Sequence, residues 1–318
     1  RGYNEMKVYI PKHLGGAGLP IYNGYFNAWE ILGFDPEWYI DSIPKGRPKE
    51  YYAMTREDKL LSLPEKDCSD FVEDSKASFI FTPSNYYPKP WGEHPNWVSN
   101  PPEDYVKFIE NIDHAHLWSF GNSKGTEKDF YPDWKKDVHY VPLAFDDGMY
   151  NRIAKKDPKY KFDICFIGGW ADNGFDEKRK IMIEHFSFFN TEFEKLGLKA
   201  GLSVEQNIST EDEASILYSS KIAINLHDAY QREVGTDSNE RTFKSLGLNG
   251  FLICDKVKEV ENLFPLVPTA SNPQEFMQLI KFYLDKSDED MKELKDMNKE
   301  DIMENHTYQN RVKQMLEL

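Results

Sequence analysis

Two short apolar segments, one near the start of the chain and one in its middle, run into glycines and then into a helix-favouring segment. The first is MKVYIP followed by KHLGGAGLP, and the second is FDICFIGGW, which contains Gly168 and Gly169. Glycine permits a tight turn after a strand and a close approach of a ligand to the backbone, and the following helix offers free N–H groups. The repeated pattern predicts two separate α/β domains.

Strand-like and helix-like segments alternate along both halves, which predicts parallel sheets with helical crossovers. A chain of 318 residues also exceeds the usual size of one hydrophobic core. We expect two Rossmann-like doubly wound domains facing a cleft, because ligands of such sheets bind at the carboxyl ends of the strands. The predicted domains cover residues 6–150 and 151–300, and a C-terminal helix over residues 301–318 is expected to pack back toward the first domain.

The apolar periodicity gives the expected elements in more detail. Strands are predicted over residues 6–11, 77–84, 114–120, 138–145, 162–170, 221–228 and 251–255, with a short one near residue 199. Helices are predicted over residues 22–34, 102–112, 176–193, 212–220, 239–247, 260–264, 273–284 and 300–318. The polar stretch 146–161 is expected to be a linker, and the acidic stretch 288–290 is expected to lie between helices.

The overall composition disfavours several classes of partner. The formal net charge of −15 disfavours attraction to phosphate backbones, so nucleic acid is not an expected partner. No apolar run approaches the roughly 18 residues of a membrane span, no signal peptide opens the sequence, and we expect a cytoplasmic protein. Cys68, Cys165 and Cys254 are scattered, which is typical of core cysteines in a reducing compartment.

The glycine-rich loop of the first half contains Gly15, Gly16 and Gly18. These glycines can either bring the backbone close to a ligand or form a tight turn for packing of helix on sheet. The spacing is not GxGxxG, and no acidic residue sits at the end of a second strand to bind a ribose, so a dinucleotide site is disfavoured. The loop is a candidate for a cleft or acceptor contact.

The second glycine pair, Gly168 and Gly169, precedes a helix that carries Lys178 and Arg179 near its start. The backbone amides of such a turn, together with either cation, can bind a diphosphate. No GK[ST] follows the glycines, which disfavours nucleotide hydrolysis.

The segment INLHDAYQREVGTDSNERTFKSLG is the third candidate. A strand ends near His227, and Ser238 or Asn239 can cap the next helix. Arg241 then lies in the first turn, where a cation is unfavourable unless an anion is bound beside it. A bound phosphate explains this position, and a surface ion pair is the alternative. The alternative partners are Glu233, Asp237 and Glu240.

A metal site is not expected. His114 and His116 have no cysteine partner and no HExxH spacing, which disfavours zinc. No Asp-x-Asp follows a strand, so a metal-chelated nucleotide sugar is not indicated either.

Five segments, in this order and spacing, resemble the CgeB-like group of GT-B glycosyltransferases, which are similar to the glycosyl transferases of group 1. The resemblance covers residues 138–312. The segments are VHYVPLAFDDGMY, YKFDICFIGGW, KIAINLHDAY, NERTFKSLGLNGFLICDKVKEVENLF and ENHTYQNRV.

The resemblance implies a hexosyl- or pentosyltransferase with no obligatory metal or other cofactor. A nucleotide-diphosphate sugar, with UDP-sugar favoured, is held by the second domain, and a hydroxyl acceptor, expected to be a glycan, is held by the first. Gly247 and Gly250 permit a tight turn from helix to strand, and HTYQNR starts the last helix. The residues implied in donor binding are Gly168, Gly169, Arg179, His227, Asn239, Arg241, Thr242 and Lys244.

Arg241 is the expected stabiliser of the leaving diphosphate, with Lys178 or Arg179 as a weaker candidate, because negative charge develops there as the glycosidic bond breaks. Retention of the anomeric configuration is favoured by analogy. An inverting reaction needs a base on the acceptor side. The candidate bases are His13, Asp113, His114 and His116.

Lys244 departs from the family pattern, which commonly has a ribose-binding glutamate at this position. This departure favours one alternative, a non-catalytic nucleotide- or sugar-binding protein on the same fold. A transferase acting on modified nucleic acid bases is a further alternative, which the net charge disfavours.

Overall fold

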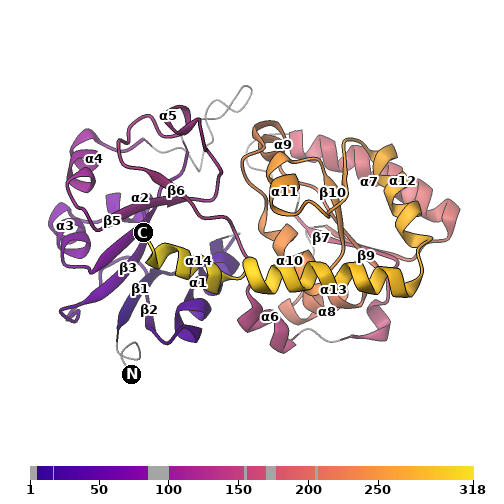
Figure 1. The fold of residues 1–318 in the computed structure, drawn as a ribbon, viewed down its shortest axis with the longest axis horizontal. Coiled ribbons are helices and arrows are strands. Elements are labelled where there is room, and N and C mark those ends of the chain that lie inside the picture. The colour runs from indigo at the N-terminus through magenta and orange to yellow at the C-terminus, as the bar shows by residue number, and fades with distance from the viewer. Residues whose placement is uncertain (1–5, 17, 85–99, 154–155, 170–176, 205–206) are drawn as a thin grey trace. The chain divides into compact units, whose positions relative to one another are not determined.

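The computed structural model describes residues 6–16, 18–84, 100–153, 156–169, 177–204 and 207–318 (Figure 1). The chain forms two compact units. Unit 1 comprises Arg1–Pro142 together with Tyr308–Leu318, and unit 2 comprises Leu143–Thr307. Each unit is built on its own parallel sheet.

The sheet of unit 1 has six strands in the order β2-β1-β3-β4-β5-β6, and all neighbouring pairs are parallel. The strands are β1 (Lys7–Pro11), β2 (Asp35–Tyr39), β3 (Tyr51–Arg56), β4 (Ala77–Phe81), β5 (Ala115–Ser119) and β6 (Val138–Tyr140). The helices are α1 (Gly18–Ile31), α2 (Glu57–Leu61), α3 (Glu65–Glu73), α4 (Glu103–Glu110), α5 (Glu127–Phe130) and α14 (Tyr308–Leu316).

The inner strands of unit 1 are buried almost throughout, as parallel strands are when both faces of a sheet are covered. Helix α14 packs on α1, at the place where Gly24 faces the ring of Tyr308. A Cβ atom at Gly24 would lie 2.3 Å from that ring, so glycine is required for this close packing. The Nε of Arg311 also donates to the carbonyl oxygen of Pro142 at 2.9 Å, which fixes α14 within unit 1.

The sheet of unit 2 has five parallel strands in the order β11-β10-β9-β7-β8. The strands are β7 (Ile164–Gly168), β8 (Ala200–Val204), β9 (Ile222–Asn225), β10 (Leu252–Asp255) and β11 (Thr269–Ala270). The helices are α6 (Asp147–Ile153), the 3-10 helix η1 (Pro158–Tyr160), α7 (Glu177–Leu196), α8 (Thr210–Ser219), α9 (Ala229–Val234), α10 (Glu240–Leu248), α11 (Lys258–Leu263), α12 (Pro273–Leu284) and α13 (Asp288–Asn305).

The hydrophobic core of unit 2 lies between the sheet and the helix pair α7 and α12, which run beside each other (Figure 1). Phe189 of α7 is fully buried and contacts Phe276 of α12 with ring centroids 5.5 Å apart. Helices α8 and α13 both pack on α10, so α10 is enclosed and its residues are mostly buried. Its N-terminus is thereby held in a fixed position next to the strands.

The two glycines in and after the last turn of α10 have different roles. Gly250 has a φ of +79°, and a Cβ atom there would lie 2.5 Å from the carbonyl oxygen of Lys295, so it makes the turn and admits α13. Gly247 lies inside α10, where a Cβ atom would lie 2.7 Å from the ring of Phe145. Gly247 therefore makes room for a side chain, and the expectation that it forms the turn is wrong.

Most expected elements are found, and the differences have local causes. Strands β2 and β3 were not predicted, because β2 contains Pro36 and alternates poorly, and β3 has the aromatic and polar sequence YYAMTR. The expected linker over residues 146–161 contains α6 and η1 instead. The acidic stretch 288–290 is the first turn of α13, capped by Ser287, so its expected position between helices is wrong.

The expected continuous C-terminal helix is divided. Helix α13 ends at Asn305 and α14 starts at Tyr308. Between them the backbone N–H of Phe145 donates to the carbonyl oxygen of His306 at 2.8 Å, and Phe145 bridges to Thr307. The break is made by a tertiary contact with the segment before α6, which helical periodicity cannot show.

Candidate functional site

The carboxyl ends of three strands of unit 2 meet at one edge of the sheet. Strand β7 ends at Gly168, β9 at Asn225 and β10 at Asp255, and these strands are neighbours in the order β10-β9-β7 (Figure 1). The N-terminus of α10, which connects β9 to β10, lies at the same edge because the connection leaves the end of β9. Ligands of parallel α/β sheets bind at such an edge.

The start of α10 is capped by Asn239, whose Oδ1 accepts from the backbone N–H of Thr242 at 3.2 Å. The sequence predicts either Ser238 or Asn239 as the N-cap, and in the structure the N-cap is Asn239. The cap satisfies one of the free donors of the first turn. The amides of Glu240 and Arg241 have no acceptor within the helix, because the preceding turn does not exist. They are available to an anion.

The side chain of Arg241 turns back over the ends of β7 and β9. Its Nη1 donates to Oδ1 of Asn225 at 2.8 Å and, more weakly, to the carbonyl oxygen of Leu226 at 3.4 Å. Its guanidinium carbon lies 5.0 Å from the ring centroid of Phe166. A Cβ atom at Gly168 would lie 2.4 Å from Nη2, so only glycine leaves room for the guanidinium at the end of β7.

Among the residues that the structure describes, Arg241 has no ion-pair partner. No carboxylate oxygen of the described residues lies within 4.0 Å of its guanidinium, and Nε and Nη2 donate to no described group. Burial lowers the pKa of Arg241 from its ordinary value, although the charges of Asp228 and Glu240 act in the opposite direction. The surface ion pair considered as the alternative is therefore not formed.

The geometry suits an anion. A partly desolvated cation and the free amides of a helix N-terminus lie together, and both favour negative charge. Gly168, at the strand end, leaves room beside them. We refer to Arg241, Gly168, Asn225 and the first turn of α10 as the Arg241 site.

His227 and Thr242 lie beneath the Arg241 site, not on its surface. His227 Nδ1 lies 2.7 Å from Oδ1 of Asp255 and Nε2 lies 3.0 Å from Oγ of Ser238, so both ring nitrogens are engaged. Thr242 Oγ1 accepts from Nδ2 of Asn225 at 3.0 Å. His227 and Thr242 are 0% exposed. The sequence predicts that both side chains contact the nucleotide sugar, but in this arrangement neither side chain can reach it.

Lys244 lies deeper along α10 and is enclosed by two carboxylates. Its Nζ lies 2.9 Å from Oε1 of Glu213 and 3.0 Å from Oε1 of Glu240, and 5.5 Å from the ring centroid of Tyr150. Burial alone would lower the pKa of Lys244, but the two carboxylates outweigh it and raise the pKa. The ammonium group thus forms ion pairs with Glu213 and Glu240 inside unit 2. The structure does not place Lys244 for the expected contact with a nucleotide sugar.

The remaining residues expected to bind the nucleotide sugar follow β7 or begin α7. Gly169 follows β7 directly and is partly exposed, and Arg179 is exposed in the first turn of α7. The side chain of Lys178 lies outside the described residues. Of the cations expected at a phosphate, Arg241 is the one that the structure places beside Gly168.

His13 lies at the carboxyl end of β1 in unit 1. Its ring stacks on Tyr22 with centroids 5.3 Å apart, and a Cβ atom at Gly18 would lie 2.6 Å from it. Burial, and secondarily the charge of Arg56, lowers the pKa of His13 below its ordinary value. The imidazole is therefore neutral near neutral pH and able to accept a proton.

The other two glycines of this loop, Gly15 and Gly16, are exposed, and a Cβ atom at either would meet no atom within 4 Å. Gly16 has a φ of +65°, which the turn requires. The loop at the carboxyl end of β1 is thus open to a ligand at Gly15 and Gly16, whereas Gly18 serves the packing of His13.

The other candidate bases lie elsewhere in the unit 1 sheet. Asp113 and His114 precede β5 and are therefore at its amino end, where His114 Nε2 lies 3.1 Å from the carbonyl oxygen of Val72. His116 lies within β5 and stacks on Phe79 with centroids 5.9 Å apart. Of the four candidates, only His13 is at the carboxyl edge.

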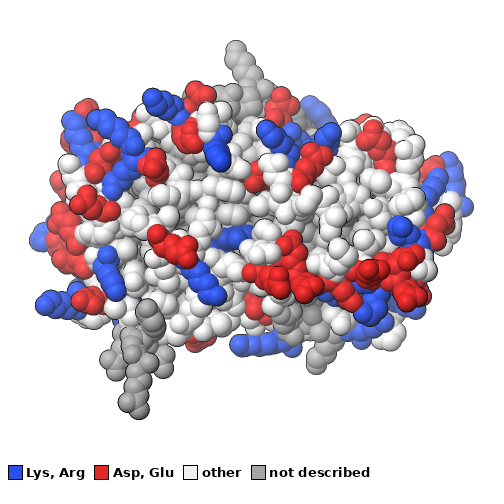
Figure 2. Space-filling model, in the orientation of Figure 1, with Lys and Arg blue, Asp and Glu red and all other residues white. Residues whose placement is uncertain are grey.

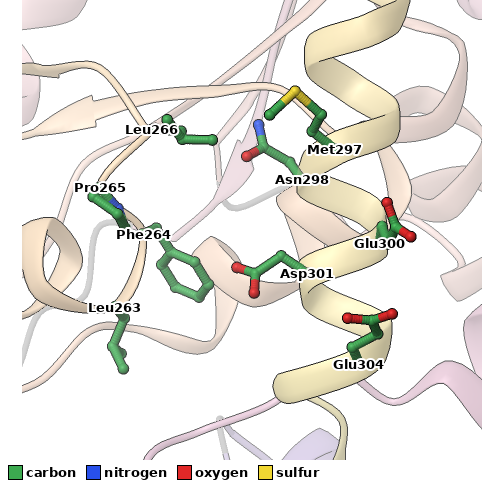
Figure 3. A pocket seen from close by; sticks show the side chains of 9 residues that line it. All are labelled: Leu263, Phe264, Pro265, Leu266, Met297, Asn298, Glu300, Asp301 and Glu304. Atoms are coloured by element: carbon green, nitrogen blue, oxygen red, sulfur yellow. The ribbon is translucent and has the colours of Figure 1, made fainter.

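A cavity of about 400 Å³ lies on unit 2 between α13 and the segment before β11 (Figure 3). It is at the amino end of β11, away from the Arg241 site. Acidic side chains line α13 (Figure 2), and they would repel a phosphate. The lining residues are Leu263, Phe264, Pro265, Leu266, Met297, Asn298, Glu300, Asp301 and Glu304.

Among the described residues, no group of three or more His, Cys, Asp or Glu side chains is arranged to hold a metal ion. Within the same residues, no helix combines the length and apolar character needed to cross a membrane. The three cysteines are free and buried, as the sequence predicts.

Known structures share the fold of the whole chain. T4 phage β-glucosyltransferase is 11% identical with a TM-score of 0.59, over 98% of this chain and 100% of that chain. An α-glucosyltransferase in complex with UDP-glucose and DNA is 12% identical with a TM-score of 0.60, over 98% of each chain. A glycosyltransferase from Rickettsia africae ESF-5 is 11% identical with a TM-score of 0.56, over 100% of this chain and 98% of that chain.

These likenesses, with the two parallel α/β sheets, identify the fold as GT-B. No curated protein sequence matches the chain. A family model described as glycosyl transferase-like matches residues 158–317, which is half of the chain and includes all residues of the Arg241 site. The chain therefore belongs to the glycosyl transferase-like family.

Proposed function

We propose that the protein transfers a hexose or pentose from a nucleotide-diphosphate sugar, with a UDP-sugar favoured, to a hydroxyl group of an acceptor, with a glycan favoured. Within its family we assign it to the CgeB-like group. The family membership and the GT-B fold support the reaction class. The preference for UDP draws support from the solved structures, since UDP-glucose is named as the substrate of the T4 phage enzyme.

The observation that carries the proposal is the guanidinium of Arg241, which lies beside Gly168 at the first turn of α10 and pairs with no carboxylate in the described part of the chain. A diphosphate bound there would accept hydrogen bonds from Nε and Nη2 and from the amides of Glu240 and Arg241. Breakage of the anomeric bond increases the negative charge on the leaving diphosphate. Positive groups held in place before the reaction stabilise that charge without reorganisation.

The same site supports a reaction without an obligatory metal or other cofactor. In metal-dependent transferases a divalent cation neutralises the diphosphate, whereas here the guanidinium and the helix amides are placed to do so. Arg179, exposed in the first turn of α7, is a second candidate contact to the phosphates. Retention of configuration is favoured by analogy with related GT-B enzymes.

For the acceptor we propose unit 1, with the loop of Gly15 and Gly16 as a contact. If the reaction inverts, His13 is the favoured base, because it is at the carboxyl edge of the sheet and neutral near neutral pH. Asp113, His114 and His116 are disfavoured by their positions at or before the middle of β5.

Glycan and nucleic acid acceptors need a direct comparison, because three of the similar structures contain DNA. The net charge of −15 opposes binding to a phosphate backbone. We expect transfer to oligosaccharides and no gel shift with DNA containing hydroxymethylated bases at low salt. A shift that salt abolishes would favour the nucleic acid alternative.

The proposal is tested by incubating the protein with a panel of nucleotide sugars and measuring released UDP or GDP. We expect release that depends on an acceptor and that Arg241→Ala lowers by about 100-fold or more, the usual effect of removing one donor to a developing negative charge. Arg152→Ala, at an exposed position of α6, is the matched control and should retain full activity. Binding of nucleotide sugars without any turnover would instead indicate a non-catalytic binding protein.

A further inference from the structure

Beneath Arg241, four side chains form a continuous hydrogen-bonded chain with no exposed surface. Asp255, His227, Thr242 and Asn225 are each 0% exposed. The chain runs from Asp255 Oδ1 to His227 Nδ1 at 2.7 Å, from His227 Nε2 to Thr242 Oγ1 at 3.2 Å, and from Thr242 Oγ1 to Asn225 Nδ2 at 3.0 Å. It ends where Asn225 Oδ1 meets Arg241 Nη1 at 2.8 Å.

The hydrogen bonds at the two ends of this chain have defined directions. The Asp255 carboxylate also accepts from the backbone N–H of His227 at 3.0 Å, so it accepts and His227 Nδ1 donates. At the other end the hydroxyl oxygen of Thr242 accepts from Nδ2 of Asn225. His227 Nε2 lies beside the same hydroxyl and so links the two ends.

The amide of Asn225 is thereby held in one orientation. Its Nδ2 donates to Thr242 Oγ1 and to Oδ1 of Asn239 at 2.8 Å. Its Oδ1 accepts from the guanidinium at 2.8 Å and, more weakly, from Nδ2 of Asn239 at 3.4 Å. A flipped amide would place Oδ1 against Oδ1 of Asn239 and Nδ2 against the Arg241 cation. The orientation of the Asn225 amide, which holds Arg241, is thus set by the hydrogen bonds that begin at Asp255.

This chain costs stability unless it is fully satisfied, since buried polar groups lose their hydration. Asn225 comes from β9, Asp255 from β10 and Thr242 from α10, and His227 comes from the loop that follows β9. Ser238 Oγ contacts both His227 Nε2 at 3.0 Å and Thr242 Oγ1 at 2.8 Å, which closes the network. Apolar side chains could fill the same space, but they could not orient Asn225.

We infer that Asp255, His227 and Thr242 are positioning residues, which act through Asn225 to hold the guanidinium of Arg241 in the geometry that binds the diphosphate. This inference rests on the proposed function. None of the three touches the ligand. Their effect is therefore expected on recognition of the diphosphate and not of the nucleoside.

The test uses Thr242, because valine has nearly the same shape and lacks the hydroxyl. The full-length protein is titrated calorimetrically with UDP, GDP, uridine and guanosine. We expect Thr242→Val to weaken binding of the preferred diphosphate about tenfold and to leave binding of its nucleoside unchanged. Thr242→Ser, which keeps the hydroxyl, should restore most of the affinity.

Thr55→Val is the matched control, because Thr55 is equally buried and its Oγ1 accepts from the hydroxyl of Tyr39 at 2.6 Å in unit 1. It should not change the affinity. Thermal melting of each variant checks folding; if Thr242→Val does not fold, Thr242→Ala and Ser238→Ala replace it, with the same expectation.

A double-mutant cycle separates positioning from a general loss of packing. In the Arg241→Ala background, Thr242→Val should have no further effect on the diphosphate. An equal loss in both backgrounds, or an equal loss for nucleoside and diphosphate, would overturn the inference. If neither UDP nor GDP binds the wild type, or if Arg241→Ala leaves their affinity unchanged, the proposed function itself fails. If Arg241→Ala lowers the affinity for the diphosphate but Thr242→Val does not, only the positioning role is refuted.

Discussion

The Nη1 atom of Arg241 donates to Oδ1 of Asn225 across 2.8 Å, and this neutral acceptor is the polar side chain that holds the cation in place. An amide orients a guanidinium without neutralising it. A carboxylate in the same position would satisfy the charge and compete with any bound anion.

Asn225→Asp is therefore expected to abolish the anion site. The new carboxylate would pair with Arg241, but its second oxygen would face Oδ1 of Asn239, which now accepts from Nδ2. We expect the affinity for UDP to fall at least tenfold, with some loss of thermal stability. Calorimetric titration measures the affinity, and thermal melting checks that the variant is folded. Asn298→Asp, on α13, is a control that should leave UDP binding intact; an affinity for UDP equal to the wild type in Asn225→Asp would show that the charge of Arg241 is not used.

Gly168→Ala should displace the guanidinium. The added Cβ atom would lie 2.4 Å from Nη2 of Arg241, so the side chain must move from the end of β7. We expect sugar transfer to fall by about 100-fold, comparable to removal of one catalytic hydrogen-bond donor. Gly201→Ala is the control, because a Cβ atom there would lie 2.5 Å from the ring of Phe162 and not beside Arg241, and it should keep its activity. Full activity of Gly168→Ala would contradict the placement of Arg241.

Asp237 should make the stability depend on pH. Burial, and then the charges of Asp228 and Glu259, raises the pKa of Asp237 to about 7. Because the folded state holds this proton more tightly than the unfolded state, the contribution to stability is complete below pH 4 and is lost as the pH rises through 7. The free energy of unfolding of Asp237→Asn should therefore be closer to the wild-type value at pH 5 and should exceed that value at pH 8.

Urea denaturation at the two pH values measures the effect. Asp67→Asn, at an exposed position of α3, is the control and should not change the pH profile. A constant difference between Asp237→Asn and the wild type from pH 5 to pH 8 would count against the raised pKa.

Lys244→Glu should destabilise unit 2 and not restore a ribose contact. The substitution would place three carboxylates together with Glu213 and Glu240, where one buried cation now pairs with both. Loss of one partner from a buried ion pair costs about 3–5 kcal/mol, and denaturant titration measures it. Lys292→Glu, in an exposed pair with Asp296, is the control and should lower the free energy of unfolding much less. Increased UDP affinity in Lys244→Glu would instead support a ribose role for this position.

The fold could be anticipated largely because the signals are local. Gly168 and Gly169 after a β-rich run, and Asn239 before a helical period, specify a strand end and a helix start through φ/ψ freedom and capping. The elements that were missed, such as β2 and the break at His306, depend on partners distant in sequence. No local pattern encodes them.

The amino-acid sequence alone places Arg241 in the first turn of a helix that follows a parallel strand, where a cation is unfavourable without an anion. The packing of unit 2 selects the neighbours of its guanidinium. Gly168 and Asn225 lie beside it, whereas His227 and Thr242 are buried below and Lys244 is paired with Glu213. The physical reason is that a helix start is set by short-range hydrogen bonds, while the direction and burial of a side chain depend on which strands and helices are packed around it.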